Sequence, residues 1–279
     1  MPRIIGVHGV GHQFSGENML LQQWLPALRD GLKRSDGPTI QGDDLACAFY
    51  GDLFRSNAKG APIPDFIADD LNPDEQMLLQ LWWEQAANTD QMVRAPSEAT
   101  KVGVPLSIQR GLNALMQSSF FAGIAERALI FDLKQVYRYL HDSEIRSAAR
   151  KRIEDRIDSE TRVIIAHSLG SVIAYESLCA NPDWPVTDLI TLGSPLGIRH
   201  LIFDKLEPNP QQGIGAWPAG LRRWVNISDV RDVVALNKKL NPVFAPSVSD
   251  VSVNNGAKSH DATRYLTTRE VGHAVAIAL

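Results

Sequence analysis

The sequence contains few cysteines. Cys47 and Cys179 are the two cysteines in 279 residues, and both lie in apolar segments far apart in the chain. Small domains held together by disulfides, and zinc modules, use more cysteines at closer spacing. Both thiols are therefore expected to be buried and unpaired, and neither a disulfide nor a metal site is predicted.

The sequence also lacks long hydrophobic runs and blocks of basic residues. No apolar run approaches the ~20 residues that span a bilayer, and the net charge of −4 argues against a nucleic-acid partner. Residues 3–7 enter an apolar strand without the pattern of a secretory signal. A cytoplasmic protein is expected, and 44% hydrophobic content in 279 residues is enough for one large domain.

Short β-branched runs alternate with helical patterns along the chain. The run at 163–165 has no polar alternation, which is typical of a strand buried on both faces of a parallel sheet. This alternation predicts an α/β fold, with a mostly parallel central sheet flanked by helices. The predicted strands are residues 3–7, 45–50, 163–165, 188–192, 223–228 and 248–253. The main predicted helices are residues 18–33, 73–85, 108–116, 120–158 in two parts, 169–178, and a last one from about 269.

Residues 53–119 form a segment longer than a connection between two strands requires. About a dozen residues suffice for such a crossover, whereas this segment contains two helical stretches. The first starts at residues 72–75, with proline at the first helical position and acids in the first turn. We expect a helical cap over the active site, within a single domain of residues 1–279. The pairs Trp82-Trp83 and Phe120-Phe121 either pack this cap or form an acyl channel or a membrane-touching lid.

The strand at 163–165 is followed by a turn of small residues and then by a helix. Ser168 lies at this corner, with Ala166 and Gly170 two residues away on either side. Small residues suit a strained turn that leaves little room for side chains. The pattern is typical of a nucleophile elbow, although the usual first glycine is an alanine here. The backbone N–H of Leu169, at the start of the helix, is then one predicted oxyanion donor.

A second glycine-containing turn, with the sequence HGVGH at residues 8–12, follows the first strand. An acyl-transfer enzyme of this architecture places its other oxyanion donor there. We assign this role to the N–H of Val10, with Gly11 as the neighbouring alternative. The glycine spacing does not fit a dinucleotide-binding loop. The residues expected to contact the substrate are His8, Gly9 and His167, with a loop-shaping His8 and a surface or pocket-rim His12 as the alternative interpretation.

An acid and a base are needed to complete a triad. Asp229 and Asp232 both follow the strand at 223–228, where the acid of this architecture is expected. Asp232 is favoured because it lies further beyond the strand, and Asp229 would then cap the loop, but the choice stays open. His260, in a polar loop near the end of the chain, is the predicted general base.

Two further residues compete for these roles. Ser194 also follows a buried strand, but Pro195 after it has no N–H to offer as an oxyanion donor. His273 lies within the apolar pattern of the last helix, which favours a structural role over a catalytic one. Neither is therefore assigned to the triad.

These segments together resemble the α/β-hydrolase superfamily over nearly the whole chain. The resemblance rests on the His-Gly loop, the Ala-His-Ser-Leu-Gly-Ser turn, and the order Ser168, Asp232, His260. The similarity is closest to bacterial lipase-like or esterase-like serine hydrolases with a helical cap. It implies hydrolysis of carboxylic esters through an acyl-enzyme, on a small-molecule or lipid-like substrate, with no metal or organic cofactor.

Two alternatives to this function stay open. A thioesterase or acyltransferase would use the same triad with a different acyl acceptor. A non-catalytic binding module on a hydrolase scaffold is the alternative outside enzymes, because a fold does not fix a function. A complete candidate triad argues against the binding module. The sequence departs from the pattern of the superfamily at Ala166 and in the oxyanion loop, where a single glycine is followed by Val10, and this loop puts esters of bulky tertiary alcohols in doubt.

Overall fold

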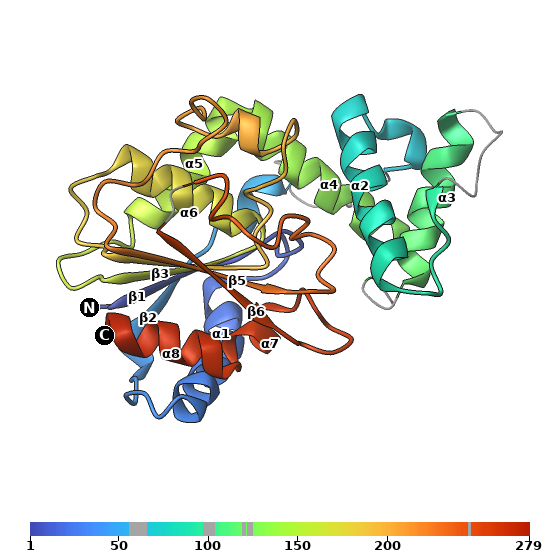
Figure 1. Cartoon of the computed structure of the whole chain (residues 1–279). Helices are drawn as coiled ribbons and strands as arrows, with labels where there is room; N and C mark the ends of the chain where they lie inside the picture. Colours follow the sequence, from blue (N-terminus) through green and yellow to red (C-terminus); the bar gives the residue numbers. More distant parts are fainter. Residues whose placement is uncertain (56–65, 97–103, 119–120, 122–124, 245–246) are drawn as a thin grey trace.

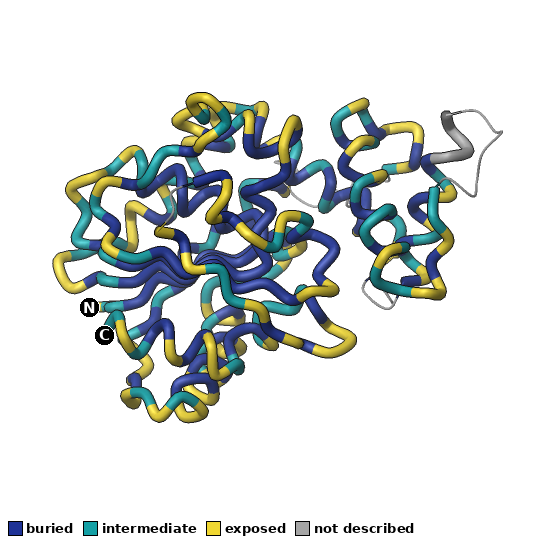
Figure 2. Tube along the Cα trace, viewed as in Figure 1, coloured by how far each residue is buried: buried dark blue, intermediate teal, exposed yellow. Residues whose placement is uncertain are grey.

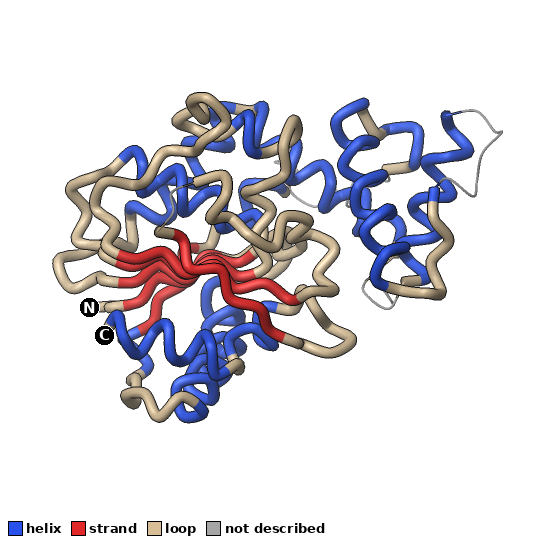
Figure 3. The backbone as a smooth tube through the Cα atoms, viewed as in Figure 1, coloured by secondary structure: helices blue, strands red, loops and turns tan. Residues whose placement is uncertain are grey.

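The computed structural model describes residues 1–55, 66–96, 104–118, 121, 125–244 and 247–279. Within these residues the chain forms one six-stranded sheet in which every neighbouring pair of strands is parallel (Figures 1 and 3). The strands are β1 (Ile4–Val7), β2 (Leu45–Ala48), β3 (Val163–His167), β4 (Asp188–Leu192), β5 (Arg223–Asp229) and β6 (Val248–Val253). All six predicted strands are confirmed, and so is the predicted α/β class.

The order of the strands is β2-β1-β3-β4-β5-β6. The chain therefore starts inside the sheet at β1, moves outward to β2, and returns to the other side of β1 at β3. In open parallel sheets, ligands bind beyond the carboxyl ends of the strands at the point where the strand order reverses. That point lies between β1 and β3, whose carboxyl ends lead into residues 8–12 and into Ser168.

The second strand ends two residues earlier than predicted. The backbone N–H of Tyr50 donates to Nε2 of His8 (3.1 Å), and residues 51–54 form a short 3-10 turn. Tyr50 also donates its hydroxyl hydrogen to the backbone oxygen of His8 (2.7 Å). The chain after β2 is thus bonded to the loop after β1 instead of continuing the sheet.

Eight α-helices occur within the described residues. They are α1 (Glu17–Arg34), α2 (Pro73–Thr89), α3 (Val104–Gln117), α4 (Glu126–His141), α5 (Ser143–Glu154), α6 (Leu169–Ala180), α7 (Ala262–Leu266) and α8 (Arg269–Ala278). Helices α1, α7 and α8 cover one face of the sheet, and α5 and α6 cover the other (Figure 1). The short helix α7 was not predicted, and it follows His260 directly.

The core consists of two apolar clusters, one on each face of the sheet. Alternate strand residues contribute to opposite clusters, since neighbouring side chains in a strand point to opposite faces. Ile5 and Ile164 belong to the cluster under α5 and α6, whereas Ile4 and Ile165 belong to the cluster under α1 and α8. Strands β1, β3 and β4 are buried along their whole length (Figure 2), which explains their largely apolar sequences, whereas the edge strand β6 is partly exposed.

Helices α2 and α3 form a lobe beside the sheet, and α4 runs from this lobe to the body of the fold (Figure 1). The predicted start of α2 is confirmed: Asn72 accepts a hydrogen bond from the N–H of Glu75 (3.0 Å), and the Glu75 carboxylate accepts one from the N–H of Asn72 (2.9 Å). Two ion pairs join this helix start to the body. Lys134 of α4 pairs with Glu75 (3.2 Å), and Lys205 pairs with Asp74 (2.5 Å).

The predicted break in the long helical region at 120–158 is confirmed at Asp142, which caps α5 by accepting from the N–H groups of Glu144 and Ile145. Both cysteines are free thiols. Cys47 is buried as expected, whereas Cys179 is half-buried because it lies at the end of α6. No helix in the described part of the chain has the length and apolar character needed to cross a membrane.

Candidate active site

Ser168 lies between the end of β3 and the start of α6. Its φ of 54° is in the left-handed region, which is strained for residues other than glycine. Residues held in such strained conformations often mark functional sites. The N–H of Ser168 donates to the carbonyl of Leu192 in β4 (3.0 Å), which fixes the turn to the sheet. The turn is therefore strained and held in place, as a nucleophile elbow requires.

Two glycines allow this turn to pack against the loop after β1. A Cβ atom on Gly170 would lie 2.3 Å from the carbonyl oxygen of His8 and 2.5 Å from that of Val7. A Cβ atom on Gly9 would lie 2.7 Å from Cβ of Ser168. Real Cβ atoms do not approach other atoms so closely, so any larger residue at either position would move the turn or the loop.

Asp232 and His260 form a hydrogen-bonded pair beside this turn. Nδ1 of His260 donates to Oδ2 of Asp232 over 2.7 Å, which leaves Nε2 as the basic nitrogen of the ring. The carboxylate is fully buried and accepts three further hydrogen bonds. They come from the hydroxyl of Tyr265 (2.8 Å) and the backbone N–H groups of Val234 (2.9 Å) and Ala235 (3.2 Å).

The Asp232 carboxyl remains ionised despite its complete burial. Burial alone raises its pKa, but the nearby His260, its hydrogen bond and the Lys238 ammonium more than offset this effect. The net result lowers the pKa of Asp232 to about 2. An ionised carboxylate at this position holds the His260 ring in one tautomer and stabilises the ring when it gains a proton.

The structure brings Asp232, and not Asp229, against His260. Asp229 accepts hydrogen bonds from the backbone N–H groups of Arg231 (2.7 Å) and Asn255. Its own N–H donates to the hydroxyl of Tyr265 (2.8 Å). Asp229 thus caps the loops on either side of it, which is the role expected for it if Asp232 is the acid.

His167, directly before Ser168, anchors the loop that carries His260. Its Nε2 donates to the backbone carbonyl of His260 over 2.7 Å, and the two ring centroids are 4.5 Å apart. Burial, together with the neighbouring His260, lowers the pKa of His167 to about 3. His167 is therefore neutral at physiological pH, and it positions His260 through its backbone.

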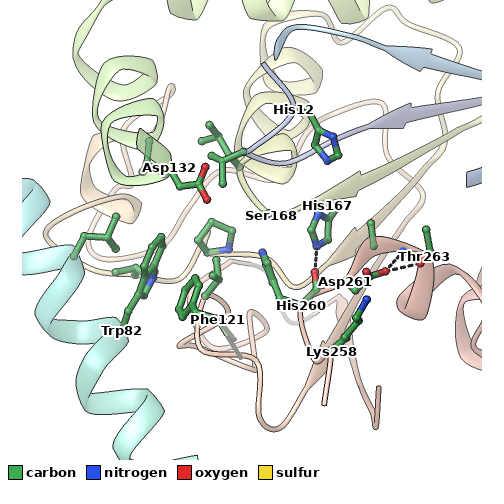
Figure 4. Close-up of a pocket in the computed structure, with 18 of the residues that line it drawn as sticks. His12, Trp82, Phe121, Asp132, His167, Ser168, Lys258, His260, Asp261 and Thr263 are labelled. Carbon is green, nitrogen blue, oxygen red and sulfur yellow. Dashed lines mark hydrogen bonds between the residues drawn. The ribbon is translucent and has the colours of Figure 1, made fainter. Parts of the chain in front are cut away.

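A cavity of about 610 Å³ lies above this constellation (Figure 4). Its two ends differ in chemistry. On one side of Ser168 lie the rings of Trp82 and Phe121, and on the other side lie Lys258 and Asp261. The apolar residues that line the cavity include Leu78, Trp82, Phe121, Val136, Ile198 and Ile202.

The predicted site residues occupy different places relative to this cavity. Five of them line it: Val10, His167, Ser168, Leu169 and His260. Asp232 lies behind His260. His8 and Gly9 are not among the lining residues, in contrast to the expectation that they contact substrate.

His8 has a different position because its ring serves the fold. Its Nδ1 donates to the carbonyl of Gly9 (2.7 Å), and its Nε2 accepts from the N–H of Tyr50. The ring stacks on that of Tyr50, with centroids 4.1 Å apart. Burial, with a smaller effect of His12, lowers the pKa of His8 to about 3. Both ring nitrogens are therefore engaged, and His8 shapes the loop that packs against Ser168.

The two competitors for catalytic roles lie elsewhere. Ser194 is buried, with its hydroxyl 2.7 Å from that of Ser171, and it accepts from the N–H of Leu196. His273 is exposed on α8. Phe120, one of the aromatic residues predicted for the cap, lies outside the described residues, whereas Trp83 packs within the lobe and donates to the carbonyl of Arg94 (2.7 Å).

Two residues of the site were not predicted. Asp132 of α4 lines the cavity, and Tyr265 of α7 binds the carboxylate of Asp232. Asp132 carries a signal in the sequence, because it is the one acid within the apolar run from Ala128 to Leu133. The sequence around Tyr265 carries no such signal, because it does not show that the Tyr265 hydroxyl reaches Asp232.

No three side chains of His, Cys, Asp or Glu gather at a potential metal site in the part of the chain that the structure describes. Comparisons of the chain with protein-family models, with curated proteins and with solved structures found no match. Any inference about function therefore rests on the geometry of the site.

Proposed function

We propose that the protein is a serine hydrolase of the α/β-hydrolase type that cleaves carboxylic esters. The observation that carries this proposal is the 2.7 Å contact of His260 with Asp232, next to a serine in a strained turn that lines a cavity. A hydrogen-bonded acid and base at such a nucleophile are the parts that acyl transfer requires.

The proposed reaction has two steps. His260 takes the hydroxyl proton of Ser168 as its oxygen attacks the ester carbonyl, and then gives this proton to the leaving alcohol, so that an acyl-enzyme forms. Water, deprotonated by His260, then attacks the acyl carbonyl, and His260 returns this proton to the oxygen of Ser168 as the bond to the acid breaks. Asp232 keeps the ring oriented throughout, because its carboxylate accepts the Nδ1 proton.

The negative charge that develops on the carbonyl oxygen needs donors. Leu169 is the first residue of α6, so its N–H has no acceptor within the helix and lies at the positive end of the helix dipole. Val10 follows Gly9, which packs against Ser168, and both Val10 and Leu169 line the cavity. We assign the oxyanion hole to these two N–H groups, each of which is typically worth about a hundredfold in rate.

We further propose that the lobe of α2 and α3 is the cap of this active site. Leu78 and Trp82 of α2 line the cavity together with Ser168 and His260. The lobe thereby excludes water from one side of the reacting carbonyl, which strengthens the hydrogen bonds made to it.

Steady-state hydrolysis of a short-chain 4-nitrophenyl ester tests the proposal. Wild-type protein is expected to hydrolyse the ester, and Ser168→Ala to reduce kcat by about a millionfold, to the background rate. Ser194→Ala is the matched control, because it removes a hydroxyl after the neighbouring strand without touching the cavity. Retained activity in Ser168→Ala, or none in the wild type, would contradict the proposal.

A further inference from the structure

Asp132 is an acidic residue that the proposed reaction does not use. It is half-buried on α4 and lines the cavity on the same side of Ser168 as Trp82 (Figure 4). Its carboxylate also lies over the loop after β1, because a Cβ atom on Gly11 would be 3.6 Å from Oδ1 of Asp132. A carboxyl group therefore faces the cavity on this side of Ser168.

The protein supplies a weak hydrogen bond to this carboxyl group and no ion pair within the residues that are described. Nε2 of Gln135 donates to Oδ1 over 3.3 Å. Lys134, two residues further along α4, pairs with Glu75 instead. Burial raises the pKa of Asp132 to about 7. Near neutral pH the group is thus divided between its neutral and its charged forms, and a bound cation would favour the charged form.

The other titratable groups of the cavity come from elements on other sides. His12 comes from the loop after β1 and His167 from the end of β3, and burial lowers the pKa of both. The loop before α7 contributes Lys258, His260 and Asp261. Helix α2 contributes Leu78 and Trp82, which carry no charge. Lys258 therefore lies beside Asp261, at the end of the cavity opposite to Asp132 (Figure 4).

Two aromatic rings line the same side of the cavity as Asp132. The centroids of Trp82 and Phe121 are 5.8 Å apart, and both side chains are largely buried. Aromatic faces attract alkylammonium groups, and they do so more strongly where water is excluded. A carboxylate together with two aromatic rings is the chemistry that recognises an ammonium group on an apolar chain.

The proposed mechanism decides which part of the substrate reaches this side. His260 must give a proton to the leaving alcohol, so the alcohol lies on the side of His260 and of the loop with Lys258 and Asp261. The acyl group then extends the other way, toward Asp132, Trp82 and Phe121.

We infer that Asp132, with Trp82 and Phe121, selects substrates whose acyl group carries a cationic amine, and discriminates against acyl groups that end in a carboxylate. This inference rests on the proposed acyl transfer at Ser168. Asp132 is a specificity-determining residue in this scheme and takes no part in the bond-breaking steps.

Three 4-nitrophenyl esters of similar size test the inference. The cationic substrate is the ester of 4-(trimethylammonio)butanoate, and its neutral isostere is the ester of 5,5-dimethylhexanoate. The anionic substrate is the monoester of glutarate. The measured quantity is the ratio of kcat/KM between the cationic ester and its isostere. Both esters use the same base, so any pH dependence that the two reactions share cancels in this ratio.

The ratio is expected to rise about tenfold between pH 6 and pH 8, as Asp132 loses its proton and gains the charge that attracts the ammonium group. The ratio of kcat/KM between the glutarate ester and the neutral isostere is expected to fall over the same pH range. Asp132→Asn should make both ratios independent of pH. Asp69→Asn is the control, because it removes an exposed carboxylate of the lobe outside the cavity and should retain the wild-type dependence.

Two results would overturn the inference: a cationic-to-neutral ratio that stays flat with pH in the wild type, or a pH dependence that persists in Asp132→Asn. If Asp132→Asn fails to fold, the pH dependence of the cationic-to-neutral ratio in the wild type still tests the inference. Failure of the proposed function looks different, since none of the three esters would then be hydrolysed at a rate that depends on Ser168.

Discussion

The side chains that line the cavity are held by different interactions on its two sides, the side next to the sheet (the sheet side) and the side next to the lobe of α2 and α3 (the lobe side). On the sheet side, hydrogen bonds between 2.7 and 3.2 Å link His260 to Asp232 and to His167, and link Asp232 to Tyr265 and to two backbone N–H groups. On the lobe side, the lining residues Leu78, Trp82 and Phe121 are apolar, and Asp132 has one weak hydrogen bond from Gln135.

This difference indicates that the two sides of the cavity have different roles. Hydrogen bonds have preferred directions, so they can hold reacting groups within a few tenths of an ångström, whereas apolar contacts are non-directional and tolerate exchange of one shape for another. We therefore expect changes on the sheet side to lower the rate for every ester. Changes on the lobe side should instead alter which ester is preferred.

Substitution of the acid should have the largest effect among the supporting residues. Asp232→Asn is expected to lower kcat by about a thousandfold or more, because an amide cannot hold the imidazole in the required tautomer. Asp229→Asn should lower the free energy of unfolding, but it should keep kcat per active site within a few fold, since the Asp229 side chain accepts its hydrogen bonds from the loop N–H groups of Arg231 and Asn255. Hydrolysis rates and urea unfolding of the two variants measure this difference. A larger loss of kcat in Asp229→Asn would reverse the assignment.

The contact between Gly9 and Ser168 offers a second test of the sheet side. Gly9→Ala would place a methyl group 2.7 Å from Cβ of Ser168, so either the serine or the loop with Val10 must move. A displacement of the reacting groups by about 1 Å costs about a hundredfold in kcat. Gly16→Ala is the control, because no atom lies within 4 Å of the added methyl group. Equal kcat values for the two variants would show that the loop does not need to touch the serine.

The two neighbouring tryptophans of α2 test the lobe side, where the expected effect is smallest. Trp82 lines the cavity, whereas Trp83 packs inside the lobe. Trp82→Leu should change the kcat/KM ratio between a long-chain and a short-chain ester by about tenfold, through lost apolar contact. Trp83→Leu should lower stability without changing that ratio. A ratio that changes equally in both variants would assign the effect to general loosening of the lobe.

The sequence predicted most of the fold because the central strands β1, β3 and β4 are short, largely apolar runs followed by turn residues. β3 is fully buried and begins with three consecutive β-branched residues, Val163 to Ile165. The capping box at Asn72, where α2 starts, is complete in the sequence. Helix α7 was missed since it has only five residues, from Ala262 to Leu266. So short a segment shows no helical periodicity.

The candidate site was predictable where local sequence fixes local geometry. Ser168 and Gly170 belong to one turn, so their spacing is informative. The pairing of His260 with Asp232 could only be a choice between two aspartates, because it depends on how two loops at the sheet edge meet. Asp132 reaches the cavity from a helix that precedes the turn at Ser168, and only the packing of α4 places it there.

Labelling with a fluorophosphonate probe, followed by mass spectrometry of the peptides, tests the central claim most directly. The proposed triad predicts one covalent adduct, located on Ser168, which forms quickly in the wild type and about a thousandfold more slowly in His260→Ala. An adduct on another residue, or labelling of Ser168 at an unchanged rate in His260→Ala, would contradict the claim that Ser168, His260 and Asp232 act together.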